Sequence, residues 1–121
     1  MPTAHASQRD VIRSLARELT EVAAGEENRL AIQRWRDVNA LRKPDRAPVW
    51  CRPMGCWAEL LPESELVCTA PHLRGIELQF RRALVKCDIG NDTPVADHFP
   101  VHAIFDVDPR SEEHTSELQS R

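Results

Sequence analysis

Three charged side chains lie where the chain could bind or convert an acidic small molecule. Arg52 follows directly after the short apolar segment APVWC, residues 47–51. Asp106 ends the alternating segment HFPVHAIFD, residues 98–106, and Asp108 lies two residues further on. A guanidinium can hold a carboxylate through two parallel hydrogen bonds. We therefore interpret Arg52 as a candidate substrate-binding residue, the alternative being an exposed surface arginine, and the two aspartates as candidate catalytic residues.

A metal site near these aspartates is a weaker interpretation. His98, His102 and Asp106 are spaced by four residues, so all three would lie on one face of a strand. Histidine and aspartate are common metal ligands. Residues four apart along a strand are, however, about 13 Å apart, which is too far for a single ion. We therefore predict no metal site in this segment.

The cysteines and the overall charge favour a non-secreted protein that does not bind nucleic acid. The chain has 121 residues, a net charge of −3 and four cysteines whose spacings match no common zinc motif. We expect these cysteines to be reduced and half-buried. No apolar run approaches the length of a membrane span, and the N-terminus has no secretory pattern. These features predict a cytoplasmic protein with neither nucleic-acid nor membrane partners. The basic residues of segment 71–86 are interpreted as a solvated helix face.

Helices are predicted over three segments. Residues 7–24 carry apolar side chains at helical spacing and end at Gly25. Residues 26–41 repeat the pattern more narrowly and end before Pro44, because the residue before a proline disfavours helix. Residues 71–86 begin with a proline that suits a first helical turn. A short helical turn is expected at residues 57–61.

Two strands are predicted between and after these helices. The segment APVWC, residues 47–51, is short and apolar, as in a strand buried on both faces of a parallel sheet. In residues 98–106, apolar and polar positions alternate with period two. The order of helices, strand, loop, helix and strand predicts the α/β fold class, with only the opening part of a parallel sheet present.

The stretch RWRDVNALRKPDRAPVWCRP, residues 34–53, resembles the start of proteins in the uroporphyrinogen decarboxylase superfamily. In that superfamily a helix of the form R-x-x-x-A-L leads into PDRxPV, which opens the first barrel strand. The matching positions here are Arg36, Ala40, Leu41, Pro44, Asp45, Arg46, Pro48 and Val49. The later segment PVWCRPMGCWAELLPES, residues 48–64, resembles a segment of true decarboxylases at its PVW start and at LPE.

This resemblance implies N-terminal helices in residues 1–43 and about two β/α units of a truncated TIM barrel in residues 44–109. It also implies an enzyme that decarboxylates a small or tetrapyrrole carboxylate. Other branches of the superfamily transfer methyl groups, with a corrinoid protein as possible partner and zinc as a possible cofactor of the full-length protein. Active sites of such barrels lie at the carboxyl ends of the strands. Arg52 would lie at one such end.

The final segment RSEEHTSELQSR, residues 110–121, differs from everything before it. It resembles the translation of a high-throughput sequencing adapter over eleven consecutive residues. We therefore exclude it from reasoning about the fold, as for any non-native tail. The natural protein is expected to continue beyond about Pro109, so the chain would be an inactive fragment of the enzyme. A small non-enzymatic α/β binding module, with a native tail, is the alternative.

Overall fold

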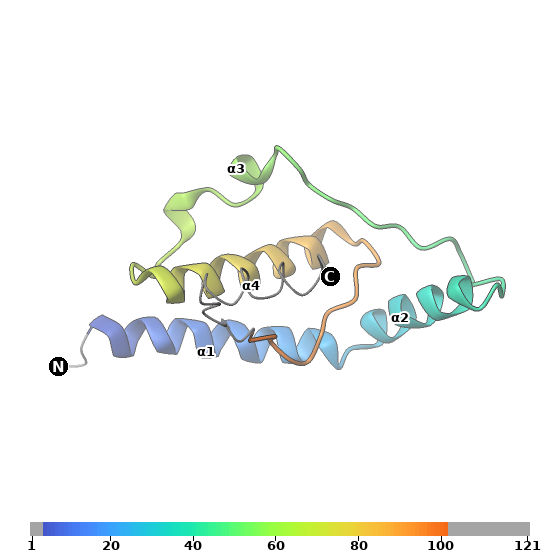
Figure 1. Ribbon diagram of the computed structural model, residues 1–121, viewed down its shortest axis with the longest axis horizontal. Coiled ribbons are helices and arrows are strands. Elements are labelled where there is room, and N and C mark those ends of the chain that lie inside the picture. The colour runs from blue at the N-terminus through green and yellow to red at the C-terminus, as the bar shows by residue number, and fades with distance from the viewer. Residues whose placement is uncertain (1–3, 102–121) are drawn as a thin grey trace, which may run out of the picture.

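The computed structural model describes residues 4–101 and is built from helices (Figure 1). Two long helices form its body, and a third long helix continues beyond the first. A single helical turn and a 3₁₀ turn interrupt the connecting loop. The elements in chain order are α1 (Ala4–Ala23), α2 (Glu26–Asn39), α3 (Trp57–Leu60), η1 (Glu63–Glu65) and α4 (Pro71–Ile89).

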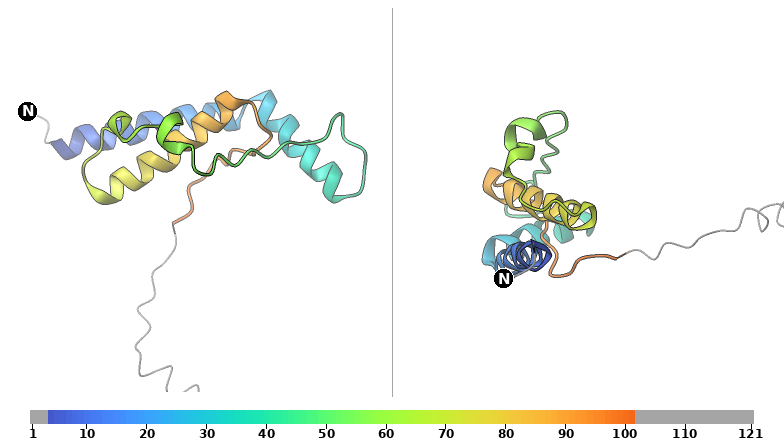
Figure 2. Two further views of the ribbon diagram at one scale, coloured as in Figure 1. Left: turned by 90° about the horizontal axis from the view of Figure 1, so that it is seen from above. Right: turned by 90° about the vertical axis from the view of Figure 1, so that its left-hand side faces the viewer.

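Helices α1 and α4 lie side by side and run in the same direction (Figures 1 and 2). Their contact buries Leu15 and Leu19 of α1 and Leu73 of α4. Cys68 and Ala70, which directly precede α4, are buried in the same core. Because parallel helices need a long return connection, residues 40–70 pass back along the molecule before α4 begins.

Buried polar side chains fasten the start of α4 to α1. Gln8 of α1 accepts hydrogen bonds from the backbone N–H groups of Thr69 and Ala70, both at 3.1 Å. The fully buried Glu77 of α4 accepts from the N–H groups of Val67 and Cys68, both at 2.8 Å. These side chains accept hydrogen bonds from the backbone N–H groups of a loop that lacks regular secondary structure. Buried backbone N–H groups need such partners.

The predicted helices are confirmed with small shifts of their ends. Helix α1 extends over Ala4–Ala23, close to the expected 7–24, and α2 over Glu26–Asn39 within the expected 26–41. Helix α4 continues to Ile89, three residues past the expected end. It stops at Gly90, whose φ of 81° is the left-handed conformation that glycine adopts readily. The short turn expected at 57–61 is α3.

The predicted α/β fold class is wrong for the residues that the structure describes. Residues 4–101 contain helices and no strand or sheet, so the two β/α units of a TIM barrel are absent from them. Residues 47–51 do not form the predicted strand. The Val49 N–H donates to the Asp92 side chain and the Val49 C=O accepts from the Asp92 N–H, at 2.8 Å each, and Pro48 has no N–H to donate. Few backbone N–H and C=O groups of this segment therefore remain free to pair with a neighbouring strand.

The second predicted strand, residues 98–106, falls mostly outside the described residues. His98 to Val101, its first four residues, are not in a strand. Asp106, Asp108 and the tail of residues 110–121 lie outside the described residues. No helix within residues 4–101 combines the length and apolar character that a membrane crossing requires.

Candidate functional site

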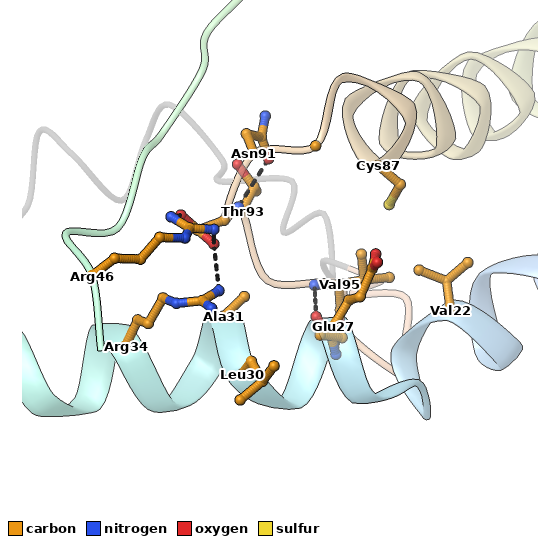
Figure 3. Close-up of a pocket in the computed structure, with 13 residues that line it drawn as sticks. Val22, Glu27, Leu30, Ala31, Arg34, Arg46, Cys87, Asn91, Thr93 and Val95 are labelled. Atoms are coloured by element: carbon orange, nitrogen blue, oxygen red, sulfur yellow. Dashed lines mark hydrogen bonds and ion pairs between the residues drawn. The ribbon is translucent and has the colours of Figure 1, made fainter. Parts of the chain in front are cut away.

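The buried carboxylate of Asp92 connects three segments that are distant in sequence. Its Oδ1 accepts hydrogen bonds from Nη1 of Arg34 at 3.0 Å and Nη2 of Arg46 at 2.9 Å. Its Oδ2 accepts from Nη1 of Arg46 at 2.6 Å and from the Val49 N–H at 2.8 Å. Figure 3 shows Arg34 and Arg46 converging from α2 and from the segment after it. Asp92 thereby fixes the loop after α4 against α2 and residues 45–49.

A second carboxylate completes this arrangement. Asp45 accepts from Nε and Nη2 of Arg34, both at 2.8 Å. The Arg34 hydrogen bond lowers the pKa of Asp45 to about 2, and the Arg46 hydrogen bond lowers the pKa of Asp92. Both aspartates are therefore ionised at neutral pH. We call Arg34, Asp45, Arg46 and Asp92 the Asp92 network; its two positive and two negative charges compensate one another, which favours a positioning role over ligand binding.

A cavity of about 350 Å³ opens beside the Asp92 network, between α2 and the end of α4 (Figure 3). Cys87 and Glu27 line it together with Arg34. Burial raises the pKa of the Cys87 thiol, and the carboxylates of Asp88 and Glu27 raise it further. Cys87 is therefore a protonated thiol at neutral pH, which makes it a poor nucleophile and a poor metal ligand.

The Asp92 network also places two tryptophans. The indole Nε1–H of Trp35 donates to the backbone carbonyl of Asp92 at 2.7 Å. Trp50 directly follows Val49, whose backbone is held by the same residue. The two rings meet edge to face, with centroids 6.1 Å apart and an interplanar angle of 74°. Trp50 nevertheless remains 59% exposed, so more than half of its surface is open to solvent.

Two cations lie against the exposed tryptophan. The Arg52 guanidinium is 5.5 Å from the centroid of the Trp50 ring, and the Lys86 ammonium is 5.9 Å from it. Both distances are within the range of a cation–π interaction. Neither cation forms an ion pair among the described residues, whose ion pairs use other basic side chains. We call Trp35, Trp50, Arg52 and Lys86 the Trp50 cluster.

Of the three sequence-predicted site residues, only Arg52 lies within the described residues. Arg52 is exposed and lies in the Trp50 cluster, whereas Asp106 and Asp108 lie outside the described residues. Sequence reasoning missed Lys86, which was grouped with a solvated helix face. No local sequence signal distinguishes it, because its approach to Trp50 depends on how the long loop folds back.

Within residues 4–101, no group of three or more histidine, cysteine, aspartate or glutamate side chains comes together. Burial raises the pKa of Cys68 to about 11, with Glu77 adding to the effect. The four cysteines are all unpaired thiols, and Cys68 is buried, as expected of a small apolar side chain.

Comparisons with known proteins give no information about this site. No protein-family model, no curated protein and no solved structure matches the chain. The chemistry of the site therefore rests on what its side chains can do. In the described residues, the Trp50 cluster combines an exposed aromatic face with two cations that lack a carboxylate partner, which is an arrangement suited to an anion.

Proposed function

We propose that the Trp50 cluster is a carboxylate-binding surface of an enzyme related to uroporphyrinogen decarboxylases, with Arg52 as the carboxylate ligand. The observation that carries this proposal is the Arg52 guanidinium on the open Trp50 ring, without an acidic partner among the described residues. The resemblance of residues 34–64 to that superfamily supports it independently. The helical fold of residues 4–101 does not support it, because the β/α units that the resemblance implies are absent from these residues.

The chemistry of Arg52 favours a carboxylate over other ligands. Its planar guanidinium presents paired N–H donors that match the two oxygens of a carboxylate. Stacking on Trp50 restricts the side chain, so less conformational entropy is lost when a ligand binds. Lys86 adds a second positive charge from α4, which strengthens the attraction for a ligand with more than one acidic group.

The proposed substrate is a small or tetrapyrrole carboxylate in the cytoplasm, and the proposed reaction is decarboxylation. In this proposal the described residues bind the acidic group, and the bond-breaking groups come from elsewhere in the enzyme. The superfamily resemblance also allows methyl transfer to a corrinoid protein or a thiol, with zinc. In an assay of the full-length enzyme, release of CO₂ from a bound substrate supports the first reaction, and methylation of an added cobalamin supports the second.

Binding of a tetrapyrrole carboxylate to the full chain tests the proposal. Uroporphyrin is titrated while the indole N–H signals of Trp35, Trp50 and Trp57 are followed by NMR. The Trp50 and Trp35 signals are expected to shift on binding. Arg52→Gln is expected to weaken binding by at least about tenfold, since a hydrogen bond to a charged group is lost. The matched control is Arg17→Gln, which removes an exposed arginine from α1. Equal affinities for the two variants would refute the role of Arg52.

A further inference from the structure

A second concave surface lies between α4 and the segment that carries α3 and η1. It encloses about 620 Å³, which is within the range of small-molecule pockets. Apolar side chains form much of its lining, and Gly75 leaves open space along the helix surface. We call this surface the α4 groove; its main lining residues are Trp57, Leu61, Gly75, Leu78, Arg74 and Arg82.

Arg82 is the unusual member of the α4 groove. Its guanidinium lies 4.9 Å from the centroid of the Trp57 ring, in cation–π contact. It forms no ion pair and donates no hydrogen bond among the described residues, and its Nε is buried without an acceptor. The buried Nε is out of reach of a ligand, so the binding capacity of this guanidinium lies in its two Nη groups, which also have no acceptor among the described residues. Its neighbour Arg81, by contrast, is paired with Glu77 at 2.9 Å.

The other arginine of the groove is already engaged. Arg74 donates to the carbonyl oxygens of Cys68 at 3.0 Å and Glu63 at 3.5 Å. These acceptors are neutral, so the positive charge of Arg74 is not compensated by a carboxylate that it contacts. Glu63 is the one acidic residue among the described lining residues, and its side chain is exposed at the rim. The groove therefore keeps a net positive charge.

Helix geometry gives the groove its shape. Arg74, Leu78 and Arg82 follow one another at intervals of four residues and share a face of α4. The two arginines are therefore about 12 Å apart along the helix axis, with Leu78 between them. Gly75 lies on the same stretch and contributes no side chain. An apolar surface therefore extends along α4 from the Arg82 guanidinium towards Arg74, and Trp57 and Leu61 flank it.

We propose that the α4 groove binds an amphipathic monocarboxylate, an aryl or acyl carboxylate. The two Nη groups of Arg82 receive the carboxylate end-on. The apolar body of the ligand lies on Leu78 against Trp57 and fills the space above Gly75. This site shares no residue with the Trp50 cluster, and it does not depend on the function proposed for that cluster.

Binding of naphthalene-2-carboxylate to the full chain tests this site, with naphthalen-2-ylmethanol as the neutral probe of equal shape. NMR of the indole N–H groups reports which tryptophan the probe reaches. The carboxylate is expected to shift the Trp57 signal and to bind at least about tenfold more tightly than the alcohol. Equal affinity of the two probes, or a shift of the Trp50 signal without that of Trp57, would overturn the proposal.

Four variants locate the binding site. Arg82→Gln is expected to abolish the preference for the carboxylate, and Gly75→Leu to block both probes by filling the groove. Gly75→Leu should keep the fold, because a side chain at Gly75 meets no atom within 4 Å of its Cβ position and the residue is helical. Arg17→Gln is the control and is expected to bind like the wild type, whereas Arg52→Gln reports any binding of the probe at the Trp50 cluster. Unchanged binding by Gly75→Leu, or loss confined to Arg52→Gln, would refute the assignment.

Discussion

Replacing Asp92 by asparagine tests whether the Asp92 network holds the loop after α4 to the rest of the molecule. The substitution keeps the shape of the side chain and removes its charge. Each Asp92 oxygen accepts hydrogen bonds from two donors. The amide –NH₂ of asparagine must therefore face two N–H groups in either orientation, and the arginines lose their buried counter-charge.

The structure sets the size of the expected effect. Removing one partner of a buried ion pair typically costs 3–5 kcal/mol. The Asp92 side chain is 3% exposed and that of Arg34 12%, but Arg46 is 48% exposed and can recover hydration. We therefore expect Asp92→Asn to lower the free energy of unfolding by about 3 kcal/mol, the lower end of that range. This is a large share of the stability of a small domain.

Urea denaturation followed by far-UV circular dichroism and tryptophan fluorescence measures this loss. The matched control is Asp45→Asn, because Asp45 also pairs with Arg34 but its side chain is 56% exposed. Exposed ion pairs contribute little, so the control is expected to lose much less stability. If Asp92→Asn costs no more than Asp45→Asn, the buried carboxylate is not what holds these segments together.

Three further predictions concern other parts of the molecule. The pKa of Asp45 is lowered to about 2 and that of Asp92 is also lowered, so their contribution to stability is complete above the ordinary aspartate pKa and is lost as the pH falls through the lowered pKa values; acid titration of unfolding should be flatter in Asp92→Asn, and equal slopes would contradict this. Burial raises the pKa of Cys68 to about 11, so iodoacetamide at pH 8 should label it more slowly than any other cysteine in the folded chain, as read by mass spectrometry; comparable rates with and without urea would show that Cys68 is not buried. Gly75→Ala should raise the free energy of unfolding by about 0.5–1 kcal/mol, because alanine favours helix and meets no neighbour there. Its matched control Gly90→Ala should lose about 1 kcal/mol at a φ of 81°, and a gain in both would indicate that backbone conformation is not the cause.

The helices of this chain could be predicted from local sequence because their determinants are local. The apolar spacing of α1, and the glycine that ends it at Gly25, can each be recognised from a few neighbouring residues. The start of α4 at Pro71 has the same character, since proline suits a first helical turn. The end of α4 was less predictable, because the helix continues past Lys86 until Gly90 supplies the left-handed conformation.

The predicted sheet failed for the opposite reason. Residues 47–51 have strand composition, but a strand exists only when another strand takes up its backbone hydrogen bonds. In the structure, Asp92, 43 residues further along the chain, forms these hydrogen bonds with Val49. Its side chain accepts from the Val49 N–H, and its backbone N–H donates to the Val49 C=O. Asp92 lies in the segment DIGNDTP, residues 88–94, whose composition is that of a turn. Nothing in this segment indicates that the Asp92 side chain would take the place of a neighbouring strand.

The Trp50 cluster was only partly predictable. Arg52 was identified by its place after an apolar segment and by resemblance to a family. Trp35 and Lys86 belong to two different helices, and each carries an ordinary helical pattern of its own. Their approach to Trp50 depends on how the long loop folds back, which periodicity does not encode. The same holds for Arg82 and Trp57 in the α4 groove.

The loop before α4 has a consequence for how the chain folds. Its four amides, Val67 to Ala70, have side chains of α1 and α4 as their acceptors and no acceptor within the loop itself. The loop can therefore become ordered only when both helices have docked, which makes these events a single cooperative step. Hydrogen exchange at these amides should consequently proceed through global unfolding and be as slow as exchange in the helix centres. A segment without regular secondary structure would then report on the most stable part of the molecule.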